Sequence, residues 1–346
     1  MTSSKHQFHF GSAALNGWAW ATAAATFVLI WSGGLVTSKG VGMAVPDWPT
    51  TFGYNMFVFP FSKWVGGIFY EHSHRLIASG VGLMTVLLAV ATFVVEPRRW
   101  VRTLSVWLVV GVVAQGLFGG LRVVLNKDHV GILHGILAQS FFCALIIFCV
   151  ATLPSFVAGR WADYFPDRGP LRLARLALVL IFLQLVLGAA MRHEHIGLAV
   201  PDFPLAYGQV IPDTSPAALE KINIARAAEG QVPLRPLFIW VHMAHRANAV
   251  FALLVVAVFF WKSRGAPNSI HRMGAVWLAA VLAQFGLGAW TVLSDKAADI
   301  ATAHVALGTL TLAWGVLLNF RLQLGLRAGM FQAPDVHPES RAHATV

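Results

Sequence analysis

The chain has 346 residues, of which 57% are hydrophobic and 12% charged, and its formal net charge is +10. This composition excludes an ordinary soluble domain and is typical of a protein that crosses the membrane several times. The basic residues lie at the ends of apolar segments and form no long run, so the charge indicates membrane topology and no nucleic-acid partner.

Eight apolar segments are long enough, or nearly so, to cross roughly 30 Å of hydrocarbon as helices. We place them at about 16–37, 73–95, 103–124, 131–153, 172–191, 237–261, 273–293 and 301–322. Three linkers hold ten of the Lys and Arg residues: 96–102, 154–175 and 262–272. The positive-inside rule therefore predicts a multi-pass protein of the cell inner or plasma membrane, with both termini in the cytoplasm.

A proline-rich loop follows the first apolar segment and returns in the second half of the chain. Gly-Met-Ala-Val-Pro-Asp-Trp-Pro at 42–49 matches Gly-Leu-Ala-Val-Pro-Asp-Phe-Pro at 197–204. Proline fixes φ, and the aspartates, Asp47 and Asp202, can close an Asx turn, so we expect two rigid outer loops. Rigid loops of this kind also make good lids over a pocket.

The second apolar segment opens with Glu71-His72-Ser73-His74-Arg75. Successive helical residues turn by about 100°, so Glu71, His74 and Arg75 share one face and His72 points roughly the other way. Charged and imidazole groups at the mouth of a membrane helix are costly and need partners. Taken alone, the stretch is explained by an i,i+4 ion pair between Glu71 and Arg75 beside a structural histidine.

The second half of the chain repeats the first in order. The matched positions are His74-Arg75 with His245-Arg246, Gln115 with Gln284, Gly119 with Gly288, and His134 with His304. Each unit has four segments, so both enter the membrane with the same orientation as parallel repeats. We therefore predict an all-α fold of two four-helix bundles, at 1–160 and 161–346. The second unit carries an insertion at 209–236, in which 217–228 is a predicted short outer helix.

Four histidines occupy repeat-equivalent positions in the first turns of alternate segments: His74, His134, His245 and His304. Imidazoles from facing helices can hold a haem iron from both sides, and no cysteine or carboxylate cluster suggests another metal. The two cysteines, Cys143 and Cys149, lie inside one segment and are predicted to be packing residues. Both histidine pairs lie at the same outer end, which favours one haem acting on a second over an electron wire across the membrane.

The repeat is asymmetric at one position, where the first half has Glu71 and the second has His242. A carboxyl group in a low-dielectric pocket can exchange protons or stabilise positive charge at a reacting carbon. The first half is therefore predicted to hold the reacting site and the second a permanent cofactor. Arg75 and Arg246 are predicted to meet haem propionates near the outer surface.

These motifs together resemble the haem A synthase family over about residues 15–325. The resemblance rests on Glu71-x-x-His74-Arg75, His134-Gly135, His-x-x-His245-Arg246 and His304, in this order and spacing. It implies an oxidoreductase of cytochrome oxidase biogenesis that oxidises the C8 methyl group of haem O to the formyl group of haem A.

The resemblance also implies a role for each site residue. His245 and His304 would ligate a haem b cofactor. His74 and His134 would hold the substrate haem, with Glu71 as the catalytic acid. The implied partners are haem O, the farnesyltransferase that produces it and the lipid bilayer, with a homo-oligomer as one option. Many members carry a cysteine pair in the outer loops, which this chain lacks, so the electron donor stays open.

Two other functions fit parts of the pattern. A b-type dihaem membrane cytochrome would bind two permanent haems and pass electrons without changing haem O. A duplicated transporter would show broken helices and polar residues near mid-membrane, whereas these segments are continuous in their centres.

Overall fold

The structure is a computed structural model that describes residues 3–125, 127–161 and 167–330. The chain ends at 1–2 and 331–346, which we expect in the cytoplasm, lie outside the described residues. The long helices are α1 (Ser3–Ser38), α2 (Gly66–Val95), α3 (Arg99–Leu125), α4 (Asp128–Ala151), α6 (Arg168–His193), α8 (Pro236–Lys262), α9 (Asn268–Leu293) and α10 (Ala298–Met330). In the described part of the chain, these eight are long and apolar enough to cross a membrane, as predicted.

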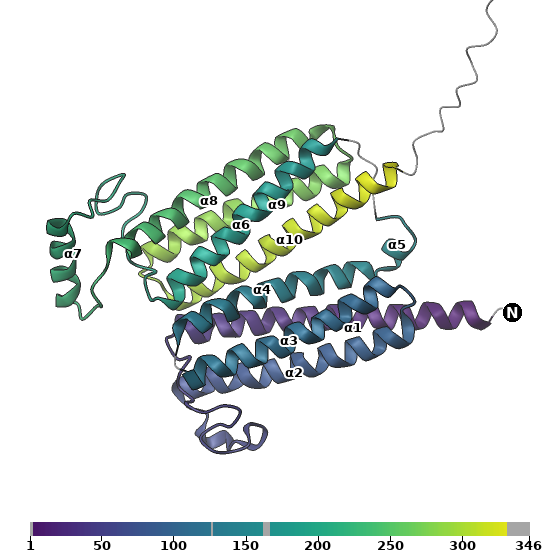
Figure 1. Cartoon of the computed structure of the whole chain (residues 1–346), viewed down its shortest axis with the longest axis horizontal. Helices are drawn as coiled ribbons and strands as arrows, with labels where there is room; N and C mark the ends of the chain where they lie inside the picture. Colours follow the sequence, from purple (N-terminus) through teal and green to yellow (C-terminus); the bar gives the residue numbers. More distant parts are fainter. Residues whose placement is uncertain (1–2, 126, 162–166, 331–346) are drawn as a thin grey trace, which may run out of the picture.

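The eight helices form two four-helix groups (Figure 1). In the first group α1 packs on α2, α2 on α3, α3 on α4, and α4 on α1. In the second, α6, α8, α9 and α10 close in the same order, and the groups meet along α1, α4, α6 and α10. The all-α fold with two bundles is thus confirmed, and each long helix runs without a break, unlike the broken helices expected of a transporter.

Both bundles share one apolar core, while many apolar side chains face outward. Buried Phe148 of α4 and Trp277 of α9 belong to the same core cluster. Outward-facing Val94, Trp107 and Val179 are mostly exposed, as expected for surfaces that contact lipid tails. The two cysteines are free and buried in α4, in agreement with their predicted packing role.

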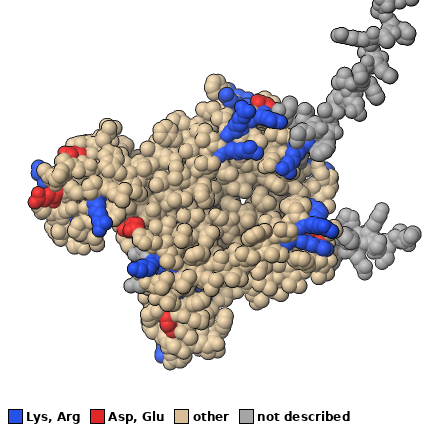
Figure 2. Space-filling model, in the orientation of Figure 1, with Lys and Arg blue, Asp and Glu red and all other residues tan. Residues whose placement is uncertain are grey.

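Charged side chains gather at the two ends of the bundles. Figure 2 shows clusters of Lys and Arg at the end that carries the α2–α3 and α8–α9 linkers, and a mixture of acids and bases at the opposite end. This distribution follows the positive-inside pattern. The end with mixed charge, called the outer end below, carries the two Pro-Asp loops.

The short elements lie in the linkers. They are the 3₁₀ turns η1 (Met56–Val58), η2 (Phe61–Lys63) and η3 (Ser263–Gly265), and the helices α5 (Pro154–Val157) and α7 (Pro216–Ala228). Helix α7 confirms the short helix predicted in the insertion, and the Oγ atom of Ser215 caps it by accepting from Ala218 N–H at 3.4 Å. In Figure 1 the insertion projects beyond the bundle ends.

Helix α2 begins at Gly66, about two turns before the apolar segment predicted from residue 73. The Glu71–Arg75 stretch therefore lies inside the helix and not at its mouth, and His74 lies in the third turn. The apolar pattern missed the start because the outer turns of α2 mix glycine, aromatic and charged residues, which cover the outer loop instead of crossing hydrocarbon.

Candidate functional site

Each of the four candidate haem ligands packs its ring edge against a glycine of the preceding long helix. A methyl group added at the glycine would lie 2.8–3.4 Å from the histidine Cε1 atom. The pairs are His74 with Gly33, His134 with Gly119, His245 with Gly188, and His304 with Gly288. Glycine is therefore what lets each imidazole lie between two helices, and the same device recurs four times.

The histidines lie in two pairs, one in each bundle. His74 lies within electrostatic reach of His134, and His245 within reach of His304. All four keep some accessible surface, whereas the nearby His72 and His242 are 0% and 2% exposed.

The Nδ1 atoms of His134, His245 and His304 are buried and have no hydrogen-bond partner among the described residues. The Nδ1 atom of His74 lies 2.8 Å from Ser32 Oγ. Paired imidazoles with glycine beside them and with polar atoms left unused suit axial ligation of a flat macrocycle. The residues present therefore fit a haem in each bundle.

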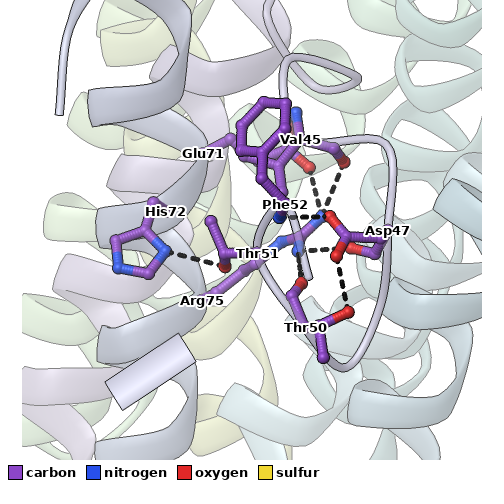
Figure 3. A network of polar contacts seen from close by, with 8 residues as sticks. All are labelled: Val45, Asp47, Thr50, Thr51, Phe52, Glu71, His72 and Arg75. Carbon is purple, nitrogen blue, oxygen red and sulfur yellow. Dashed lines mark hydrogen bonds and ion pairs between the residues drawn. The ribbon is translucent and has the colours of Figure 1, made fainter. Parts of the chain in front are cut away.

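Glu71 and Arg75 bind the first outer loop to α2 (Figure 3). The carboxylate of Glu71 contacts Arg75 Nη2 at 2.8 Å and accepts from the backbone N–H of Val45 at 2.8 Å. Arg75 also donates to the carbonyl oxygens of Val45, Asp47 and Thr50 at 2.7–3.0 Å. The i,i+4 ion pair is confirmed, and it is the centre of a larger network.

Asp47 closes the loop through an Asx-type turn, as predicted from the sequence. Its carboxylate accepts from the N–H groups of Phe52 and Gly53 at 2.7 and 2.8 Å, and from Thr50 Oγ1 at 2.5 Å. Burial alone would raise the pKa of Asp47, but the hydrogen bonds outweigh burial and lower that pKa. Phe52 and Gly53 both have left-handed φ, which the turn requires.

The second outer loop repeats this network around Arg246. Arg246 donates to the carbonyl oxygens of Val200, Asp202 and Leu205 at 2.6–3.1 Å. The N–H of Val200 donates to Nδ1 of His242 at 3.3 Å. In the first half, the N–H of the equivalent Val45 donates to Glu71 in the same way. Both arginines, Arg75 and Arg246, donate hydrogen bonds to carbonyl oxygens of the loops. Their predicted contact with haem propionates stays a prediction.

His72 lies on the opposite side of α2 from His74, as predicted, and fastens the 38–70 loop. Its Nδ1 atom is 3.1 Å from Thr51 Oγ1. Its ring contacts those of Phe59 and Trp64, with centroids 5.0 and 4.6 Å away. His72 is therefore a packing residue of the outer loop.

The outer end also holds residues that sequence reasoning missed. Nη2 of Arg192 in α6 donates to Ser38 Oγ at 2.8 Å and to the carbonyl oxygen of Gly34, both in α1. Arg122 of α3 lies nearby, within electrostatic reach of Arg192. A signal was present, because two arginines at the ends of predicted segments lack basic counterparts in the repeat.

Comparisons with known proteins agree with the predicted family. The chain matches the COX15-CtaA family, described as cytochrome oxidase assembly protein, over residues 16–316. The protein named "Heme A synthase" of Shouchella clausii is 28% identical over 243 residues, which cover 67% of this chain and 77% of that protein.

Two further relatives with the same name cover more of the chain. That of Halalkalibacterium halodurans is 26% identical over 80% of this chain and 86% of its own length. That of Geobacillus thermodenitrificans is 28% identical over 88% of this chain and 89% of its own. Since the family match runs from the first long helix to the last, this chain belongs to the COX15-CtaA family of cytochrome oxidase assembly proteins.

Proposed function

We propose that this protein is a haem A synthase, an enzyme that oxidises the C8 methyl group of haem O to a formyl group and so yields haem A. The observation that carries the proposal is the family match over 16–316, with relatives named for this activity across most of the chain. Two matched histidine pairs support it, and the position three residues before the first histidine of each pair is an acid, Glu71, in the first bundle and His242 in the second.

In the second bundle, His245 and His304 would hold the permanent haem b. The first holds haem O between His74 and His134. The support is the glycine beside each ring, the accessible surface that each histidine keeps, and the histidine chemistry that haem iron accepts. The bundle boundary near residue 160 separates the two sites.

The bound haems supply the iron redox chemistry of the oxidation. Glu71 lies one helical turn before His74 on the same face of α2, so its carboxylate can lie near the edge of the substrate ring without ligating iron. Arg75 and the N–H of Val45 hold that carboxylate in one orientation. From there Glu71 stabilises positive charge at the methyl carbon or accepts the proton that it loses.

The site opens toward the outer face of the cell inner or plasma membrane, with the 154–175 linker in the cytoplasm. The charge distribution supports this orientation (Figure 2). The farnesyltransferase that makes haem O is the partner from which the substrate comes. Reporter fusions test the orientation: fusion at residue 165 is expected to report cytoplasm and fusion in the 38–70 loop the outer side, and the reverse result refutes it.

Haem extraction tests the function. The chain is produced in cells that make haem O but have no other source of haem A, and the haems are separated by chromatography. Haem A is expected only when the chain is present. If such cells yield a protein with haem B alone and no haem A, the protein is a b-type cytochrome and the proposal fails.

A further inference from the structure

Three basic residues gather at the outer end of the interface between the bundles. They are Arg122 near the end of α3, Arg192 near the end of α6, and Lys296 in the link between α9 and α10. Arg192 lies within electrostatic reach of both other cations. We call these three residues the interface cations.

The interface cations are packed into the protein. Arg192 is half-buried, and its Nη2 atom bridges the bundles by donating to Ser38 Oγ at 2.8 Å. Burial, and then the charge of Arg192, lower the pKa of Lys296. A methyl group added at Gly42 of the outer loop would lie 3.0 Å from Arg122 Nη1. This part of the outer end is therefore tightly packed around positive charge.

Carboxylates of the described residues do not balance the charges of Arg192 and Lys296. Among the described residues the ion pairs are Glu71–Arg75, Glu96–Arg98 and His129–Glu194. Neither Arg192 nor Lys296 forms an ion pair with a described carboxylate. Cations taken out of water cost free energy unless an anion compensates them, so this cluster is suited to an anionic ligand.

The interface cations also lie between the two histidine pairs. Arg122 is within electrostatic reach of His74 and His134 of the first bundle. Arg192 is within reach of His304 of the second. An anion bound here would therefore lie within electrostatic reach of both candidate haem sites, and haem brings two carboxylates on flexible propionate arms.

The two arginines that hold the outer loops, Arg75 and Arg246, are less suited to binding an anionic ligand. Both Nη atoms of Arg75 are used, since Nη1 donates to Asp47 and Thr50 and Nη2 to Val45 and Glu71. Releasing them would unfasten the loop.

We propose that Arg192 and Lys296, with Arg122 beside them, bind the propionate carboxylates of the haems at the bundle interface. The inference rests on the proposed function only in taking haem as the ligand. Two of these three residues are not duplicated by the repeat: the counterpart of Arg192 is Thr37, and that of Arg122 is Thr291. The interface is then the place where the two haems approach each other.

Binding of haem and of its dimethyl ester tests this inference, because the ester has the same ring and iron without the two charges. The full chain is purified from cells unable to make haem and titrated with iron protoporphyrin IX or its dimethyl ester, followed by absorbance. Wild type is expected to prefer the free acid by roughly tenfold or more, as for hydrogen bonds to a charged group. Arg192→Gln is expected to remove most of that preference, and Arg192→Lys to keep more of it.

If Arg192→Gln does not fold, Lys296→Gln is measured in its place, and it should also reduce the preference for the free acid. Lys221→Gln, which removes an exposed cation of α7, is the matched control and should leave the preference unchanged. Equal affinity of wild type for both ligands would overturn the inference. So would an Arg192→Gln variant that loses affinity for both ligands equally, since that result marks a purely structural cross-link. Haem A production is measured separately, and neither of these two results decides whether the protein makes haem A.

Discussion

The two halves of the protein build similar outer loops around equivalent arginines, but they differ at the helical position that holds Glu71 in the first half. In both halves the arginine donates to three loop carbonyls. In both, a side chain on the helix accepts from the N–H of a loop valine: Glu71 from Val45, and His242 from Val200. The fold thus needs an acceptor at this position and does not need an acid.

A second difference concerns how each loop is fastened. The first loop is held by His72, which contacts Thr51, Phe59 and Trp64. The second loop has Met243 and Ala206 at the matched positions and is extended by the 209–236 insertion with α7. The first loop therefore has a buried polar anchor on the helix that bears His74, which agrees with the proposal that this loop covers the reacting site.

The largest expected effect is the loss of the haem signal of one bundle alone. His245→Ala or His304→Ala should abolish the low-spin haem b spectrum, because each removes one axial ligand. His72→Ala is the control, since it removes a histidine of α2 in the other bundle, and it should leave that spectrum in place. Retention of the spectrum in both ligand variants would overturn the assignment of the second bundle as the cofactor site.

The glycines beside the histidines allow haem binding in one bundle to be weakened without removing a ligand. A methyl group at Gly33 would lie 2.8 Å from His74 Cε1, so Gly33→Ala must shift the ring. Overpacking of this kind costs about 1–3 kcal/mol, and we expect binding of haem O to weaken by roughly tenfold while the haem b spectrum is unchanged. Gly80→Ala is the matched control, since nothing lies within 4 Å of a methyl group there. Equal haem O binding in both variants would refute this account.

The smallest effect concerns the loop aspartates. Because hydrogen bonds lower the folded-state pKa of Asp47, its stabilising contribution is full above the ordinary value of 3.8 and is lost as pH falls through the lowered folded value. The difference in protease resistance of the 38–70 loop between wild type and Asp47→Asn should therefore stay constant from about pH 8 to pH 5. Asp47→Asn should weaken the loop by about 1 kcal/mol over that whole range.

Asp213→Asn, an exposed change in the insertion, is the control for that measurement and should leave the first loop as it is. A difference between wild type and Asp47→Asn that shrinks between pH 7 and pH 5 would show that the charged carboxylate of Asp47 does not hold the loop.

Local patterns were enough to predict much of the architecture. The eight spans follow from runs of apolar residues, α7 from an amphipathic stretch, and the turn at Asp47 from proline and Asx chemistry. The Glu71–Arg75 pair follows from i,i+4 spacing. Each of these depends on residues that are neighbours in the sequence.

Long-range contacts were not predicted, because no local period encodes them. Arg192 binds Ser38 although 154 residues separate them, and Glu71 caps an N–H group 26 residues away. Gly120 of α3 packs against the ring of Trp48 in the first outer loop, where an added methyl group would overlap Cδ2. The partner of each such residue becomes known only when the helices are assembled.

The central claim is that Glu71 makes the first bundle the reacting one, and substitution at this position tests it directly. Glu71→Gln keeps an acceptor for Val45, and Glu71→His places there the residue that the second half already tolerates at His242. Both variants are expected to fold and to bind both haems, while the oxidation slows by roughly a hundredfold or more. Chromatography of extracted haems should then show haem O or its alcohol intermediate in place of haem A. Near-normal haem A from either variant would contradict the claim and leave Glu71 as a structural partner of Arg75.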